Sequence, residues 1–202
     1  MSLRNLSHRQ LNLVRLSVFV LMLVPVFRLV WAGMQDNLGA NPIEFITRNT
    51  GDWTLYALCM SLAITPLRHA LQWHWLIRLR RMLGLYGFFY ASLHFLCFLW
   101  FDHFFDWEEM WRDVLKRPFI TVGFVSLVLL VPLALTSSHA MMRRLGGKQW
   151  QLLHRLVYVI VPLGVLHYFW MKAGKNDVEQ AAMFGLLVAL LLGARIWRRW
   201  RN

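Results

Sequence analysis

Long apolar stretches alternate with short polar segments along the whole chain of 202 residues. Six of these stretches approach the ~20 residues that an α-helix needs to cross a bilayer, although the second is short unless its flanks extend it. They lie at about 11–33, 53–67, 82–101, 119–136, 150–171 and 178–195. The segments between them are too short to fold separately. The pattern therefore predicts an all-α membrane protein with a single transmembrane domain over residues 1–202, built as a bundle of six transmembrane helices.

The composition supports a membrane protein and argues against other classes. Hydrophobic residues make up 58% of the chain, well above the level of an ordinary soluble domain. The formal net charge of +12 does not indicate a nucleic-acid partner, because Lys and Arg fall in short clusters at the ends of apolar runs. The first stretch is too long for the apolar part of a signal peptide and carries Arg28 near its far end. We therefore expect an uncleaved first span.

The distribution of charge predicts the orientation in the membrane, because cytoplasmic loops are enriched in Lys and Arg. The N-terminal segment, the loops at 68–81 and 137–149 and the C-terminal segment hold thirteen Lys and Arg residues, whereas the opposite side holds six. Both termini are therefore expected in the cytoplasm. All ten acidic residues fall on the outer side or at outer helix ends. A carboxylate within the membrane is common in proton-coupled transporters, so its absence from the sequence weakens that interpretation.

Three histidines interrupt the apolar stretches, His94 in the third and His154 and His167 in the fifth. A polar side chain at membrane depth usually faces the bundle interior and marks a functional site, although a hydrogen-bonded core histidine is the alternative. His154 and His167 are thirteen residues apart, roughly 20 Å along a helix, so they cannot share one metal. Counted from the cytoplasmic side, His94 lies about 12 residues deep, His167 about 17 and His154 about 4. Their similar depth therefore predicts that His94 and His167 act together, as two axial ligands of one haem iron. A haem held in this way is suited to electron transfer.

His154 is then expected to serve an inner site near the cytoplasmic face. Its neighbour Arg155, with Arg80 and Arg81 at the start of the third stretch, could pair with haem propionates or with a flavin phosphate. Simple membrane topology is the alternative explanation for these arginines.

Small residues share a helical face with His94, namely Gly84, Gly87 and Ala91. They could leave room for a flat macrocycle near the backbone. Ordinary close packing of helices uses the same pattern, and the sequence favours neither explanation.

Several motifs, taken together, resemble one protein family over almost the whole chain. They are Arg80-Arg81-Met82-Leu83-Gly84-Leu85 before His94, Arg117-Pro118-Phe119, Leu135-Thr136-Ser137, and Trp150-x-x-Leu153-His154-Arg155-Leu156-x-Tyr158 followed by His167-Tyr168. Each motif alone is weak, but the combination, in this order of six spans, resembles the MsrQ (YedZ) family. Its members are the haem-binding membrane subunits of bacterial methionine sulfoxide reductase systems. The resemblance implies a ferric reductase-like transmembrane fold.

The resemblance also implies a role, that of an electron-transfer subunit of an oxidoreductase system, with catalysis in another subunit and no catalytic residue in this chain. Electrons would come from the quinone pool or from a cytoplasmic flavin reductase. They would cross by haem b, in one copy or two and with or without FMN. They would leave to a periplasmic molybdopterin subunit, MsrP, which repairs methionine sulfoxide in oxidised envelope proteins. The implied location is the bacterial inner membrane.

The wider ferric reductase-like family carries two histidines on the third span and two on the fifth. By this analogy the outer site of His94 and His167 is intact, whereas positions 80 and 81 are arginines and the inner site lacks a ligand. The acidic segment 102–113 is either a docking surface for the partner or a solvated loop.

Two other classes stay open on the sequence. One is a self-contained quinol or ferric reductase similar to cytochrome b561, which a partner test would separate from a subunit. The other is a haem-free transporter or scaffold, which predicts a visible spectrum without a Soret band.

Overall fold

The computed structural model describes residues 6–174 and 176–201, with the side chain of Arg199 left out. Within these ranges every regular element is a helix, as the apolar pattern predicts. The chain divides into two compact units, Met1–Asp102 and His103–Asn202, and each is described by itself.

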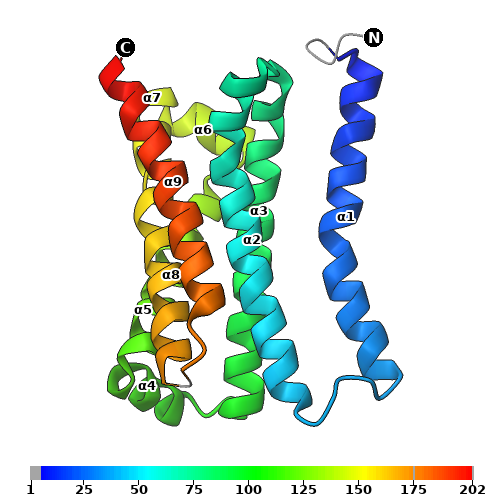
Figure 1. Cartoon of the computed structure of the whole chain (residues 1–202), viewed down its shortest axis with the longest axis vertical. Helices are drawn as coiled ribbons and strands as arrows, with labels where there is room; N and C mark the ends of the chain where they lie inside the picture. Colours follow the sequence, from blue (N-terminus) through cyan, green and yellow to red (C-terminus); the bar gives the residue numbers. More distant parts are fainter. Residues whose placement is uncertain (1–5, 175, 202) are drawn as a thin grey trace. The chain divides into compact units, whose positions relative to one another are not determined.

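The N-terminal unit contains three long helices that run in alternating directions (Figure 1). They are α1 (His8–Met34), α2 (Pro42–Leu71) and α3 (Ile77–Cys97), with the single turn η1 (His74–Leu76) before α3 and the π-helical turn η2 (Phe98–Asp102) after it. α1 starts at a capping box, in which the Gln10 main-chain N–H donates to Ser7 Oγ (3.3 Å) and the Ser7 N–H donates to Gln10 Oε1 (2.9 Å). α2 starts where Asn41 Oδ1 accepts the Glu44 N–H (3.2 Å) and ends at Gln72, whose φ of 58° is left-handed.

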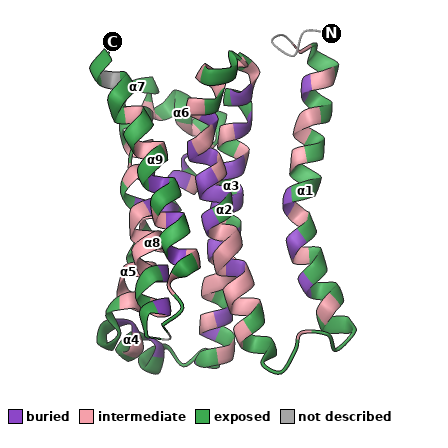
Figure 2. Cartoon of the chain, viewed as in Figure 1, coloured by how far each residue is buried: buried purple, intermediate pink, exposed green. Residues whose placement is uncertain are grey.

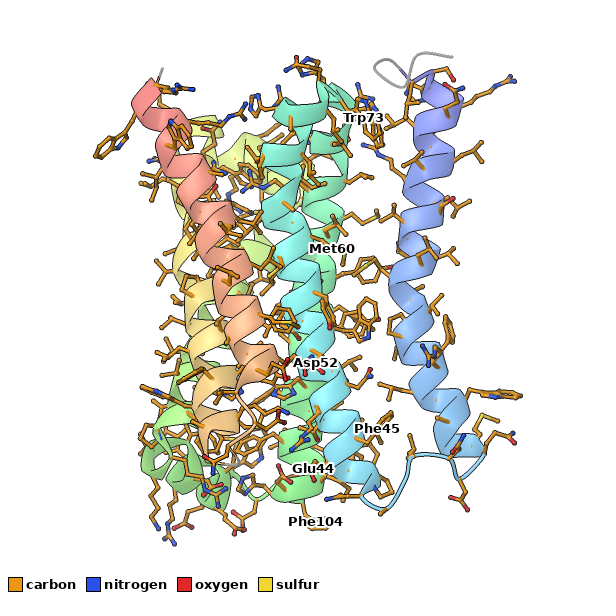
Figure 3. All side chains as sticks on the ribbon, in the orientation of Figure 1. Glu44, Phe45, Asp52, Met60, Trp73 and Phe104 are labelled. Atoms are coloured by element: carbon orange, nitrogen blue, oxygen red, sulfur yellow. The ribbon has the colours of Figure 1, made fainter. Side chains whose placement is uncertain are left out.

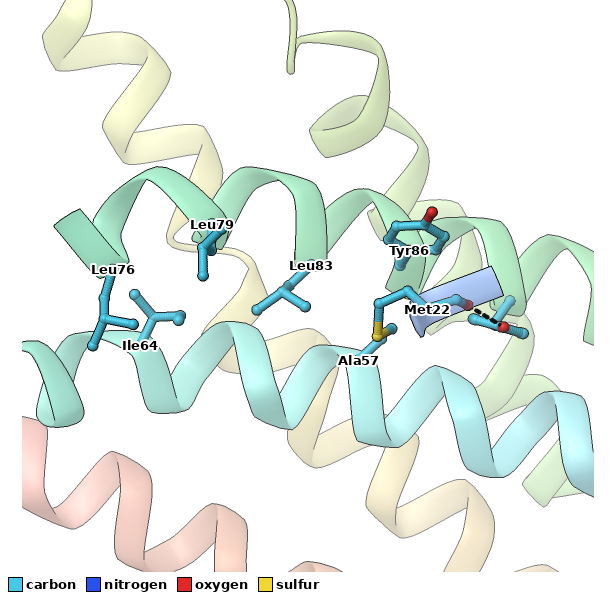
Figure 4. Close-up of a cluster of buried hydrophobic side chains, with 8 residues drawn as sticks. Met22, Ala57, Ile64, Leu76, Leu79, Leu83 and Tyr86 are labelled. Carbon is cyan, nitrogen blue, oxygen red and sulfur yellow. Dashed lines mark hydrogen bonds between the residues drawn. The ribbon is translucent and has the colours of Figure 1, made fainter. Parts of the chain in front are cut away.

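The core of the N-terminal unit lies mainly between α2 and α3 (Figure 4). Its buried side chains are Met22, Ala57, Ile64, Leu76, Leu79, Leu83, Tyr86 and Tyr90. Two tyrosines of α3 reach α1, since Tyr86 Oη donates to the Phe19 carbonyl (2.8 Å) and Tyr90 Oη to the Met22 carbonyl (2.5 Å). These bonds satisfy the phenolic hydroxyls in an apolar setting, and they connect α1 to the α2–α3 pair.

The described part of the C-terminal unit contains three short and three long helices. They are α4 (Trp107–Lys116), α5 (Pro118–Leu135), α6 (His139–Leu145), α7 (Gly147–His154), α8 (Val157–Ala173) and α9 (Glu179–Arg201). α8 packs against both α5 and α9. The indole N–H of Trp150 donates to the Thr136 carbonyl (2.9 Å), which ties α7 to the end of α5.

Five helical segments of the described residues are long and apolar enough to cross a membrane. They are His8–Met34, His74–Asp102, Pro118–Leu135, Gly147–Ala173 and Glu179–Arg198. Only 17% of the apolar window of α1 is buried, and Figure 2 shows exposed residues along that helix. An exposed apolar surface of this extent suits lipid rather than water, so the chain is a multi-pass membrane protein.

The sequence located the spans but misplaced several of their ends. The predicted second span, 53–67, lies inside α2, which is not among the five segments. Its first third carries Glu44, Arg48 and Asp52. The loop expected at 35–52 is therefore wrong beyond residue 41. The loop expected at 68–81 is also wrong, since α3 is helical from Ile77 and already contains Arg80 and Arg81.

The predicted fifth span, 150–171, is two helices, α7 and α8, separated at Arg155 and Leu156. The turn is tightened by i to i+3 hydrogen bonds, from the Leu156 N–H to the Leu153 carbonyl (3.0 Å) and from the Tyr158 N–H to the Arg155 carbonyl (3.0 Å). Pro162 does not mark this break, since it lies within α8. His154 is therefore the last residue of α7, while His167 belongs to α8.

Candidate functional site

His94 projects from α3 toward the first third of α2. Its Nδ1 lies 2.9 Å from the main-chain carbonyl oxygen of Thr47. The ring rests against Gly51, one helical turn further along α2, where a Cβ would lie 3.2 Å from both Cε1 and Nδ1. The glycine thus lets the imidazole approach the backbone of α2 more closely than another residue would.

His167 has the same construction in the C-terminal unit. It projects from α8 toward α5, and its Nδ1 lies 2.6 Å from the carbonyl oxygen of Phe119. The ring rests against Gly123, where a Cβ would lie 2.7 Å from Nδ1 and 2.9 Å from Cε1. Real Cβ atoms do not approach so closely, so position 123 tolerates only glycine unless the imidazole moves.

These hydrogen bonds determine the tautomer of both rings. A main-chain carbonyl can only accept, so Nδ1 carries a proton and donates, and in the neutral ring the lone pair is then on Nε2. A hydrogen bond from the other ring nitrogen to a carbonyl orients metal-ligating histidines and raises their basicity. Both side chains are half-buried within apolar helices. His94 and His167 therefore have the chemical state and the support of neutral imidazole ligands.

His154 is held differently. Its Nδ1 lies 3.0 Å from the carbonyl oxygen of Trp150 in the same helix, and its ring stacks on the Trp150 indole with centroids 3.9 Å apart. Because the indole itself donates to Thr136, the orientation of His154 depends on the junction between α5 and α7. The half-buried ring lies at the end of α7, where the helix gives way to the tight turn.

The arginines predicted for an inner site belong to both units of the chain. Arg80 is half-buried on α3, and its carbonyl accepts a hydrogen bond from Ser61 Oγ (3.2 Å). Arg81 lines a cavity of about 210 Å³ whose other lining residues include Arg15 of α1 and Arg78. Arg155 is exposed in the turn between α7 and α8, in the other unit.

The glycines near His94 in the sequence pack helices together. A Cβ on Gly87 would lie 2.6 Å from Leu58 Cδ2, so α2 and α3 approach closely there. A Cβ on Gly84 would lie 3.7 Å from Ser61 Oγ, at ordinary contact distance. Both glycines face α2, which favours the packing explanation over space for a macrocycle.

Sequence reasoning missed the residues that support the two histidines. Gly51 and Gly123 are single glycines in the helices that pack against those of His94 and His167. A glycine inside a transmembrane pattern is a signal of close approach, but it does not name the partner. The partners are 43 and 44 residues further along the chain.

The predicted docking segment 102–113 includes most of α4. Trp107 and Trp111 are 62% and 49% exposed on this helix. Two of its acids have internal roles, since Asp106 caps α4 and Asp113 pairs with Arg117 (3.0 Å). Asp106 nevertheless stays exposed, as do Glu108 and Glu109, and docking there stays a prediction.

A family described as "Ferric reductase like transmembrane component" matches residues 50–165, more than half of the chain. The match includes His94 and His154 and ends just before His167. Together with apolar spanning helices that carry backbone-anchored histidines, it defines the class of protein as a ferric reductase-like transmembrane component.

Close similarity to proteins of known name narrows this class. Several relatives carry the name protein-methionine-sulfoxide reductase heme-binding subunit MsrQ. The protein from Herminiimonas arsenicoxydans is 66% identical over 97% of this chain and 90% of its own length. The one from Ralstonia nicotianae is 56% identical over 98% and 91%, and the one from Rhodospirillum rubrum 50% identical over 90% and 86%. The chain belongs to the MsrQ family, a family of the bacterial inner membrane, and the resemblance in its motifs is confirmed.

Proposed function

We propose that this chain is a haem-binding subunit that transfers electrons across the bacterial inner membrane, with His94 and His167 as axial ligands of haem iron. The single observation that carries the assignment is their shared construction. Each imidazole donates from Nδ1 to a carbonyl of a neighbouring helix and rests on a glycine one turn away. The relatives named heme-binding subunits support the same cofactor.

The residues fit the donor set of a haem. Two neutral imidazoles leave iron no open position, so the bound group would exchange single electrons rather than activate oxygen. Each Nδ1 hydrogen bond fixes the orientation of its own ring and so the direction of its Nε2 lone pair, and the apolar surroundings restrict water. We assign haem b, because the sequence has no C-x-x-C-H motif for covalent attachment.

The proposal includes a direction for the electrons. They come from the quinone pool or a cytoplasmic flavin reductase, with His154, Arg80 and Arg155 on the inner side, where the arginines pair with propionates or with the phosphate of FMN. They leave to a periplasmic molybdopterin subunit of the MsrP type that reduces methionine sulfoxide in envelope proteins. The names of the relatives support this partnership, since they describe subunits of a protein-methionine-sulfoxide reductase.

Spectroscopy of purified variants tests the ligand assignment. His94→Ala and His167→Ala should each abolish the low-spin haem signal in the visible and paramagnetic resonance spectra. Insertion into the membrane should persist, because one side chain hardly changes the apolar character of a span. His139→Ala is the matched control, since His139 is exposed at the start of α6.

Full haem content and an unchanged spectrum in both variants would refute the ligand assignment. A wild-type protein without a Soret band would instead favour the transporter or scaffold class. Partner-independent reduction of ferric chelates or oxidation of quinol would favour a self-contained reductase.

The proposal also includes six membrane crossings, with α2 as the second. α2 has 30 residues, about 45 Å of helix, and packs antiparallel to α3 along their common core (Figures 1 and 4). Glu44 and Asp52 lie toward one end of α2, Met60 nearer its middle, and Trp73 just beyond the other end (Figure 3). A reporter inserted after Gln72 should lie in the cytoplasm and one after Gly39 in the periplasm. Reporters on the same side of the membrane would show that α2 does not cross it.

A further inference from the structure

Three arginines surround a cavity of about 210 Å³ between α1 and α3. Arg15 comes from α1, and Arg78 and Arg81 come from the first two turns of α3. The remaining lining residues, Met82 and Leu85, are apolar. All of these residues lie in the N-terminal unit, and the cavity stands apart from the His94 site near the opposite end of α3.

The lining changes from charged to apolar along one face of α3. Arg78, Arg81, Met82 and Leu85 are spaced as i, i+3, i+4 and i+7, which places them on a single stripe. The arginines lie nearer the end of the helix, and the apolar residues follow toward the middle of the span. A ligand that matches this stripe carries its negative charge at the membrane surface and an apolar part below it.

Within the described part of the N-terminal unit, no acidic side chain forms an ion pair with these arginines. The sequence has no acidic residue from Met1 to Gln35 or from Trp53 to Phe101. Among the ion pairs of the described residues, none involves Arg15, Arg78 or Arg81. Two of the arginines also lie near the positive end of the α3 dipole, which makes an anion there more favourable.

We infer that this cavity binds the phosphate of an anionic phospholipid, whose acyl chains continue along Met82 and Leu85. Guanidinium groups bind phosphate through paired hydrogen bonds, and basic pockets between transmembrane helices hold anionic headgroups. The predicted orientation places the cavity at the cytoplasmic leaflet. Its volume is below the roughly 300–1,000 Å³ of pockets that enclose whole drug-sized ligands. This size favours a headgroup phosphate over a complete flavin.

Native mass spectrometry of the full chain tests the inference. The protein is reconstituted in nanodiscs of phosphatidylglycerol and phosphatidylcholine, released into mild detergent, and examined for retained lipid. The wild type should retain phosphatidylglycerol selectively. The variant Arg15→Gln, Arg78→Gln, Arg81→Gln should bind it about a hundred-fold more weakly, since each basic residue near the surface contributes about a five-fold factor.

A second triple variant, Arg143→Gln, Arg144→Gln, Lys148→Gln, is the matched control. It removes the same charge from the same predicted side of the membrane, at exposed residues that line no part of this cavity. It should retain phosphatidylglycerol like the wild type. Equal lipid loss in both triple variants, or none in either, would overturn the inference.

Competition identifies the source of the phosphate. FMN or inorganic phosphate should not displace the retained lipid. Displacement by FMN, with loss of flavin binding in the first triple variant, would show a flavin site and overturn the lipid assignment. Because the readout is bound lipid, the result does not depend on whether His94 and His167 ligate haem.

Discussion

The α2–α3 pair and the α5–α8 pair each hold a histidine between a main-chain carbonyl and a glycine. The space left around the imidazole differs between the two pairs. In the first pair the His94 Nδ1 is 2.9 Å from its carbonyl, and a Cβ at Gly51 would lie 3.2 Å from the ring. In the second pair the corresponding distances for His167 and Gly123 are 2.6 Å and 2.7 Å. The imidazole of the C-terminal unit is therefore the more tightly confined of the two.

The comparison also shows which positions around the two histidines can carry different residues. The accepting carbonyls belong to Thr47 and Phe119, whose side chains have nothing in common. Only the main chain takes part, so the side chain at that position can vary. The glycine one turn further along cannot vary in the same way, because its lack of a Cβ creates the space for the ring.

Gly123→Ala should have the largest effect on the ligand sites. The new Cβ would overlap the ring of His167, so the imidazole would have to leave the Phe119 carbonyl. We expect haem retention to fall about ten-fold or more, in the range for loss of the hydrogen bond that orients a metal-ligating histidine. The haem-to-protein ratio and the low-spin paramagnetic signal measure it.

Gly185→Ala is the control for this change, because its Cβ would meet Val165 at an ordinary 3.7 Å. If Gly123→Ala keeps full haem content with an unaltered signal, the confinement of His167 does not matter for the cofactor.

His154→Ala tests whether haem ligation is limited to the two histidines that donate to a carbonyl of a neighbouring helix and rest on a glycine. The ring of His154 stacks on Trp150 and its Nδ1 bonds to the Trp150 carbonyl of the same helix, so its loss should leave the signal of the other two histidines intact. Turnover with the periplasmic partner from the physiological donor should fall roughly ten-fold, while dithionite still reduces the remaining haem. Normal turnover in this variant would make His154 a structural residue.

Gly87→Ala should lower stability through the α2–α3 interface alone. Its Cβ would lie 2.6 Å from Leu58, and overpacking of this kind costs about 1–3 kcal/mol of unfolding free energy. Gly84→Ala is the matched change one turn away, where the space exists and helix propensity adds up to about 1 kcal/mol. Denaturation in detergent micelles compares them, and equal stability of the two variants would contradict the close approach at Gly87.

Gly51→Ala should have the smallest effect. A Cβ at 3.2 Å requires the ring of His94 to yield by only a few tenths of an ångström, and the Thr47 bond can persist. We expect haem retention within about three-fold of wild type, with a small shift of the low-spin signal. Gly33→Ala, with 3.6 Å to Leu38, is the control. A loss as severe as that of Gly123→Ala would mean that the spacing does not explain the difference.

Local patterns in the sequence were sufficient for the spans and for the candidate ligands. The length of the apolar stretches predicted five of the membrane helices, because the thickness of the bilayer sets how many apolar residues a spanning helix needs. The same measure is less decisive for α2, whose charged first third makes it resemble a loop although Asn41 and Pro42 start a helix there. Histidines within apolar runs were recognisable because an imidazole among lipid-facing residues is costly.

The sequence by itself determined that this is a helical membrane protein of the MsrQ family, with histidines at positions 94, 154 and 167. Only the tertiary structure decided how each histidine is held. The Thr47 carbonyl and His94 are 47 residues apart, and Phe119 and His167 are 48 apart. Their meeting depends on the register and the distance between two packed helices. Those quantities follow from the summed contacts of many side chains, so no short motif reports them.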